Sequence, residues 1–162
     1  MEHHNIAPIW DTRSRILILG SFPSVKSREG QFFYHHPQNR FWRVLAGVLD
    51  CPVPETIEEK TAMLLTHRIA LWDVIASCEI TGSSDSSIRN VIPNDLTAIH
   101  APLHAIFCNG QTAHKLYRSF QQPILNRQAI ALPSTSPANA AWTQERLTYT
   151  WREAILPALH EP

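Results

Sequence analysis

The chain has 162 residues, enough for one compact domain with a buried core. Hydrophobic residues make up 44% and charged residues 17%, a balance that excludes an intrinsically disordered chain. Fourteen basic and fourteen acidic residues give a formal net charge of zero, which counts mildly against a nucleic-acid partner, although residues 1–43 hold six Lys or Arg and only three Asp or Glu.

Four short apolar runs predict strands. They are rich in β-branched residues and apolar on both faces, as in strands of a parallel sheet. Small, polar or turn-forming residues follow each run, such as Ala76-Ser77 after the second and Asn109-Gly110 after the third. The runs cover residues 15–20, 69–75, 103–107 and 129–132.

Helical patterns separate these runs. Three of them cover residues 40–49, 112–120 and 139–156. A fourth begins at Thr56, which together with Glu59 resembles a capping box. This alternation predicts an α/β fold with three αβα layers around a central, mainly parallel four-stranded sheet, in a single domain over residues 1–162. Ligands of such open sheets bind beyond the carboxyl ends of the strands, so we expect the functional site there.

Two long connections, residues 21–37 and 78–95, follow the first and second predicted strands. Long connections in compact domains are commonly functional or disordered. The second contains Ser86, Ser87 and Arg89, and hydroxyl groups beside an arginine can hold phosphate oxygens. Its composition alone favours an ordinary solvated loop.

Several well-known sites are missing from the sequence. Residues 20–24 contain one glycine, so they form neither a dinucleotide fingerprint nor a Walker A loop, and no GxSxG or HExxH motif is present. The side chains of the adjacent His35 and His36 should diverge, and neither has a histidine four residues on. We therefore expect no metal site and no cofactor.

The cysteines and the N-terminal segment indicate the cellular compartment of the protein. Cys51, Cys78 and Cys108 share no spacing that indicates a disulfide framework or a metal pair. Residues 1–10 lack the pattern of a signal peptide, and the longest aliphatic run, residues 16–19, is far too short to span a bilayer. We expect a cytoplasmic protein with reduced cysteines.

Residues 30–42 combine aromatic and amide side chains more densely than any other segment. Phe41 and Trp42 are predicted to be core residues of the following helix. Asn39 lies directly before that helix, where an asparagine commonly caps the first turn. Composition alone favours this capping role over a role in binding or catalysis.

Four segments together resemble the uracil-DNA glycosylase superfamily. LILGSFPS (17–24) stands in the place of the strand and GxxPG motif that activates water, and HPQNRFWRV (36–44) is similar to the HPxNRFW stretch of mismatch-specific glycosylases. ALWDV (70–74) with SSIRNVIPND (86–95), and FCNG (107–110) with LPSTSPAN (132–139), are similar to the deoxyinosine, or hypoxanthine-DNA, branch. The resemblance covers residues 16–142 and implies the three-layer fold of this superfamily.

One departure from the mismatch-specific pattern is informative. Those enzymes carry an asparagine where this chain has Phe22, and phenylalanine cannot hold a water molecule by hydrogen bonding. The deoxyinosine branch also lacks that asparagine and uses the asparagine of its HPxN stretch. The resemblance therefore implies that Asn39 is catalytic and positions the attacking water.

The resemblance also implies residues that hold the base and the DNA. Tyr34 matches the stacking aromatic residue, Phe33 is the second choice, and Phe22 is a further base-binding candidate. Asn109 matches a position that reads the base edge, and an Asn-Gly turn in the left-handed conformation is the alternative explanation for it. The predicted DNA contacts are Ser86, Ser87, Arg89, Ser134, Thr135, Ser136, Pro137 and Ala138.

The expected activity is excision of a deaminated base, hypoxanthine or uracil, from double- or single-stranded DNA by a monomeric, metal-free glycosylase. The alternatives are a mismatch-specific uracil or thymine glycosylase and a non-catalytic DNA-binding member of the fold. A metal-dependent hydrolase that uses His35 or His36 ranks last.

Overall fold

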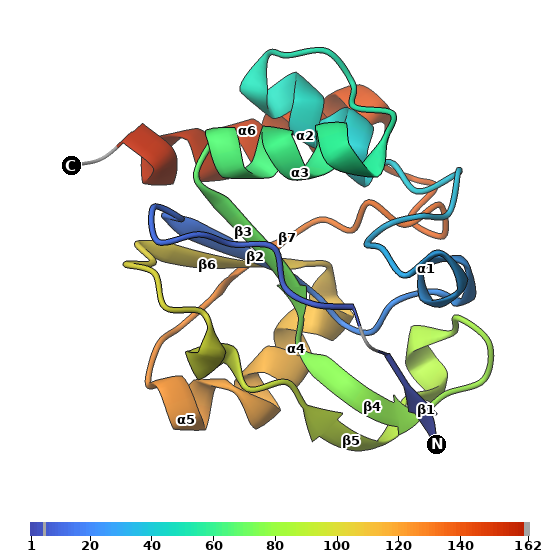
Figure 1. Cartoon of the computed structure of the whole chain (residues 1–162). Helices are drawn as coiled ribbons and strands as arrows, with labels where there is room; N and C mark the ends of the chain where they lie inside the picture. The colour runs from blue at the N-terminus through green and yellow to red at the C-terminus, as the bar shows by residue number, and fades with distance from the viewer. Residues whose placement is uncertain (5, 161–162) are drawn as a thin grey trace.

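The computed structural model describes residues 1–4 and 6–160 and has a four-stranded parallel sheet at its centre (Figure 1). The strands are β2 (Ile16–Gly20), β3 (Ile69–Asp73), β6 (Ala105–Asn109) and β7 (Ile130–Leu132), in the order β3-β2-β6-β7. Each adjacent pair is parallel. The predicted fold class is thus confirmed.

Strand β2 lies in the middle of the core. Ile16, Leu17, Ile18 and Leu19 are completely buried, because helices cover both faces of the sheet and strands flank both edges of β2. This environment explains why the run is apolar without alternation. It also places Gly20, the last residue of β2, beside Asp73, the last residue of β3.

Helices form the two outer layers. Helices α2 (Phe41–Leu49), α3 (Ile57–Thr66) and α6 (Gln144–His160) lie on one side of the sheet, and α4 (Gln111–Phe120) and α5 (Gln122–Leu125) lie on the other (Figure 1). Thr56 Oγ1 accepts a hydrogen bond from Glu59 N at 3.0 Å, which is the forward half of the predicted capping box. Within the described residues no helix is long and apolar enough to cross a membrane.

A smaller antiparallel sheet, in the order β1-β4-β5, corrects two expectations. Its strands are β1 (Glu2–His3), β4 (Ile75–Glu79) and β5 (Arg89–Pro93). The apolar run 69–75 contains two strands rather than one, because the chain leaves the main sheet after Asp73, where Val74 N and Ile75 N donate to the carbonyls of Gly20 and Ser21. The predicted long connection 78–95 therefore holds the end of β4, the short helix η1 (Asp85–Ser87) and β5.

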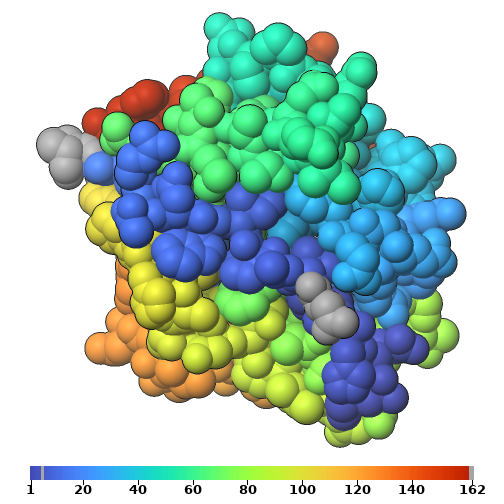
Figure 2. Space-filling model, in the orientation of Figure 1, coloured from blue at the N-terminus to red at the C-terminus, as the bar shows by residue number. Residues whose placement is uncertain are grey.

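The N-terminal segment covers the exposed edge of the main sheet. Ile9 pairs with Leu71 in an antiparallel bridge, and Trp72 Nε1 donates to Ile6 O at 3.2 Å. Figure 2 shows this segment, in blue, crossing the face of the molecule between α3 and the residues coloured yellow. An edge strand covered in this way cannot pair with another chain.

Candidate active site

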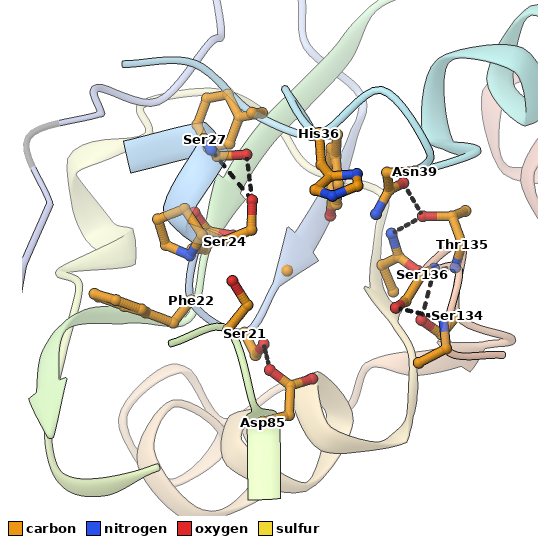
Figure 3. Close-up of a pocket in the computed structure, with 18 of the residues that line it drawn as sticks. Ser21, Phe22, Ser24, Ser27, His36, Asn39, Asp85, Ser134, Thr135 and Ser136 are labelled. Carbon is orange, nitrogen blue, oxygen red and sulfur yellow. Dashed lines mark hydrogen bonds between the residues drawn. The ribbon is translucent and has the colours of Figure 1, made fainter. Parts of the chain in front are cut away.

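A pocket of about 360 Å³ opens beyond the carboxyl ends of the main-sheet strands, where ligands of open parallel sheets bind. Its volume lies within the range of small-molecule sites. Strand ends and the loops that follow them supply its walls (Figure 3). The lining residues are Gly20, Ser21, Phe22, Pro23, Ser24, Ser27, Phe33, Tyr34, His36, Asn39, Asp73, Ser83, Asp85, Asn109, Ser134, Thr135, Ser136, Pro137 and Ala138.

Three polar side chains form one connected wall of this pocket (Figure 3). Thr135 Oγ1 donates to Asn39 Oδ1 at 2.8 Å and accepts from Asn109 Nδ2 at 2.9 Å. Thr135 N donates to Asn109 Oδ1 at 3.0 Å. Thr135 is completely buried, so this predicted DNA contact instead orients two amides inside the protein.

Asn39 faces the pocket and lies directly before α2, whose N-cap is Arg40 rather than the expected Asn39. Its Oδ1 accepts from Phe41 N at 2.9 Å as well as from Thr135, so both lone pairs of that oxygen are used. Its Nδ2 has no hydrogen-bond partner among the described residues and turns toward the cavity in Figure 3. These two bonds fix the amide so that it offers N–H donors, and no acceptor, to the pocket.

The loop of residues 133–139, here called the serine loop, is held by Arg40. The Arg40 guanidinium donates to the carbonyls of Ser136 at 3.2 Å, Asn139 at 3.1 Å and Trp142, and Arg40 N donates to Thr135 O at 3.1 Å. These residues are about 100 positions apart in sequence, and no local pattern indicates the contact.

Ser134 and Ser136 keep donors available at the pocket rim. Ser134 Oγ accepts from Ser136 N at 3.1 Å, and Ser136 Oγ accepts from Ala138 N at 3.2 Å. Neither hydroxyl donates to a described residue. Both O–H groups are therefore free to donate to an anionic ligand.

The aromatic candidates occupy different positions. The Tyr34 ring stacks on Phe41 with centroids 4.1 Å apart and rings 13° from parallel, so one face is covered. Phe33 is only 1% exposed and contributes little surface. The Phe22 ring points away from the cavity (Figure 3), beneath Arg28 and edge-on to His4. Of the three, Tyr34 has the position best suited to stacking on a ligand.

Two carboxyl groups in the pocket were missed by the sequence analysis. Asp73 is 4% exposed, and its burial together with the charge of Asp85 raises the pKa of its carboxyl to about 7. Asp85 Oδ1 accepts from Ser21 Oγ at 3.1 Å, and burial raises its pKa as well. The sequence did contain a signal for Asp73, because it is the single acidic residue in the apolar run 69–75 and marks the end of β3.

Pro137 and Ala138 line the pocket, whereas the other predicted DNA contacts, Ser86, Ser87 and Arg89, are not among its lining residues. Ser86 and Arg89 line a neighbouring groove together with Lys115 of α4. The Ser87 hydroxyl instead supports its own loop, since it donates to Ser84 O at 2.7 Å and accepts from Thr81 N at 2.8 Å. Across residues 1–4 and 6–160, no group of three or more His, Cys, Asp or Glu side chains is arranged to hold a metal ion.

Known proteins share the whole architecture. Residues 8–160 match the family model for the Uracil DNA glycosylase superfamily. A Methanosarcina acetivorans protein named Hypoxanthine DNA glycosylase is 33% identical over 145 residues, covering 85% of this chain and 89% of its own, and a Methanosarcina barkeri protein of the same name is 29% identical, with 96% and 99% covered. The solution NMR structure of a proposed uracil DNA glycosylase from Methanosarcina acetivorans gives a TM-score of 0.81 at 29% identity, covering 98% and 99% of the two chains.

Proposed function

Because the chain belongs to the uracil DNA glycosylase superfamily, we propose that it is a DNA repair glycosylase that removes hypoxanthine and leaves an abasic site. One observation carries this proposal: the free amide N–H groups of Asn39 face a pocket whose rim is the serine loop. Hypoxanthine is the preferred base because both curated relatives carry that name. Uracil is the second candidate, since it presents a similar N–H and C=O edge.

The base must leave the duplex before the enzyme can act. Extrusion costs a few kcal/mol, and less for a mispaired base. We assign Tyr34 as the stacking surface, since its ring is fixed against Phe41. The free hydroxyls of Ser134 and Ser136 would donate to phosphate oxygens beside the extruded nucleotide, with Pro137 and Ala138 filling the vacated space.

The chemical step needs water, position and charge stabilisation rather than covalent catalysis. The bond between C1′ and the base nitrogen breaks, the base keeps the electron pair, and a water molecule adds to the cation-like sugar and then loses a proton to solvent or to the departing base. We assign Asn39 Nδ2 as a donor to that water. The amide N–H occupies one lone pair of the water oxygen and leaves the other lone pair to attack the sugar. An amide is too weak a base to deprotonate water, but this positioning role does not require a base.

The remaining features belong to the same proposal. We propose that residues 1–162 act as a single, monomeric domain on double- or single-stranded DNA without a cofactor. Ser86 and Arg89, which line the protein groove next to the pocket, would contact the DNA outside the extruded nucleotide. Three free cysteines fit the reducing cytoplasm, where we place the protein.

The direct test is alkaline cleavage of an oligonucleotide duplex that carries one deoxyinosine. After incubation with the protein and EDTA, we expect strand cleavage at that site, because an abasic product is alkali-labile and the proposed reaction needs no metal ion. A parallel duplex with uracil opposite guanine measures the preference between bases. A strand that stays alkali-resistant would identify a non-catalytic binder, and activity that EDTA abolishes would identify a metal-dependent enzyme.

A further inference from the structure

A second groove lies beside the pocket, between β5 and α4. Its volume is about 570 Å³, within the range of small-molecule sites, and Asp85 of η1 lines both the pocket and the groove. Asp85 Oδ1 accepts a hydrogen bond from Ser21 Oγ at 3.1 Å, which fixes its side chain on the pocket side (Figure 3). The two cavities are therefore direct neighbours, and a strand that leaves the pocket past Asp85 reaches the groove.

The floor of this groove is apolar. Ile88, Val91 and Leu116 line it, and all three are half-buried and pack against the main hydrophobic core, which holds them in place. Phe120, the last residue of α4, also lines the groove and is half-buried. Unlike the other three, Phe120 is not packed against that core, and its ring contacts no other ring among the described residues. An aromatic ring that a helix holds without a ring partner can stack on a nucleobase.

The groove also carries two exposed cations, Arg89 and Lys115. Neither forms an ion pair within the described residues, and the Arg89 guanidinium donates only to two nearby backbone carbonyls. Asp85 is the one acid among the lining residues, and it already accepts the bond from Ser21. Cations above an apolar, aromatic floor match a nucleotide, with its phosphate at the cations and its base on the floor. An acidic peptide would match the cations as well, but continuity with the pocket favours the DNA strand that the pocket holds.

We propose that this groove binds the base of an unpaired nucleotide next to the extruded one, with Phe120 as the stacking surface and Arg89 and Lys115 at its phosphate. This assignment rests on the proposed glycosylase function, which brings the damaged strand to the neighbouring pocket. A paired neighbour stays stacked in the duplex, whereas the neighbour in a single strand is free to enter the groove. The groove therefore favours removal of deaminated bases from single-stranded or locally opened DNA over a fully paired duplex.

Removal of one base from the substrate tests this contact. The kcat/KM for excision of hypoxanthine is measured on a single strand and on matched strands in which the 5′ or the 3′ neighbour is a tetrahydrofuran analogue, which keeps the phosphates but has no base. We expect at least one of these replacements to lower kcat/KM about tenfold, as loss of one stacked base would. Equal values on all three strands would overturn the proposal and leave the groove to another occupant, such as an acidic peptide.

Variants of Phe120 test whether the groove is where that base binds. Phe120→Ala should lower kcat/KM on the single strand about tenfold and remove the effect of the missing neighbour, while kcat/KM on a fully paired duplex stays within about twofold of the wild type. Phe120→Trp keeps an aromatic face, so the effect of the missing neighbour should persist. Ile124→Ala is the matched control, because Ile124 of α5 is 67% exposed and is not among the residues that line the groove. It should change none of these values.

Two results with Phe120→Ala would overturn the assignment. An effect of the missing neighbour that persists in this variant would place the contact elsewhere, and an equal loss of activity on single strand and duplex would show that Phe120 acts only through the fold. The proposed function fails separately. Wild-type protein that leaves no alkali-labile site in deoxyinosine DNA would refute the glycosylase activity, whereas normal excision that ignores the neighbouring bases would refute the groove alone.

Discussion

The two sides of the pocket differ in how their polar groups are satisfied. On one side Asn39, Thr135, Asn109 and Arg40 bond to one another and to backbone groups, so their positions are set before any ligand arrives. On the other side Asp73 and Tyr34 are buried without partners. The first arrangement suits groups that must aim a water molecule or hold a loop, and the second suits groups that a ligand must complete. The predictions below alter one side of the pocket at a time, and the last alters a residue outside it.

The largest effect is expected from Asn39→Asp on the bonded side. An aspartate keeps an oxygen that can accept from Phe41 N and Thr135 Oγ1 but removes the N–H donors that face the pocket. We expect single-turnover excision of hypoxanthine to fall by about 1,000-fold, comparable with loss of an electrostatic donor in other active sites. Urea unfolding should show little loss of stability.

Asn39→Ala is the matched comparison for that variant. It removes the same donors and also the oxygen that accepts from Phe41 N and Thr135 Oγ1, so the free energy of unfolding should fall by about 1 kcal/mol while excision falls equally. Binding of a deoxyinosine duplex, measured by fluorescence anisotropy, should change little in Asn39→Ala. Near-normal excision in either variant would contradict the catalytic assignment of Asn39.

Asp73→Asn should stabilise the protein at high pH. The folded-state pKa of Asp73, about 7, lies above its ordinary value of 3.8, so the wild type loses stability as the pH rises from 4 to 7 and Asp73 ionises. At pH 8 we expect Asp73→Asn to be more stable by a value on the order of 4 kcal/mol, and the difference should vanish near pH 4. Urea unfolding at both pH values measures this, and an equal difference at pH 4 and pH 8 would contradict it.

The same comparison explains what the sequence could and could not predict. The main sheet was predictable because β2, β6 and β7 are continuous apolar runs, and the resemblance directed attention to Asn39, Tyr34 and the serine loop. Asp73 was missed because the run 69–75 looks like one strand, whereas backbone bonds to Gly20 and Ser21 redirect the chain after Asp73. The contact between Arg40 and the serine loop joins residues distant in sequence, which propensity and spacing do not report.

A smaller effect is expected from Arg40→Lys, which tests whether the bonded side needs its fixed shape. A lysine keeps the charge but cannot bond to the carbonyls of Ser136, Asn139 and Trp142 together. We expect excision to fall roughly 10- to 100-fold through misplacement of the serine loop. Excision at the wild-type rate would mean that the serine loop keeps its shape without these three bonds.

The smallest effect is expected outside the pocket, at Arg89. Its guanidinium donates to the carbonyls of Ser86 at 3.2 Å and Ile88 at 2.8 Å, and Arg89 lines a groove together with Lys115. If that groove holds a phosphate, Arg89→Ala should weaken duplex binding several-fold, equally for inosine-bearing and normal DNA. The slope of the logarithm of the binding constant against the logarithm of the salt concentration should become shallower by about one. Binding measured across a range of salt concentrations tests this. Because the net charge is zero, such local contacts must supply the attraction to DNA, and an unchanged salt slope would remove Arg89 from that surface.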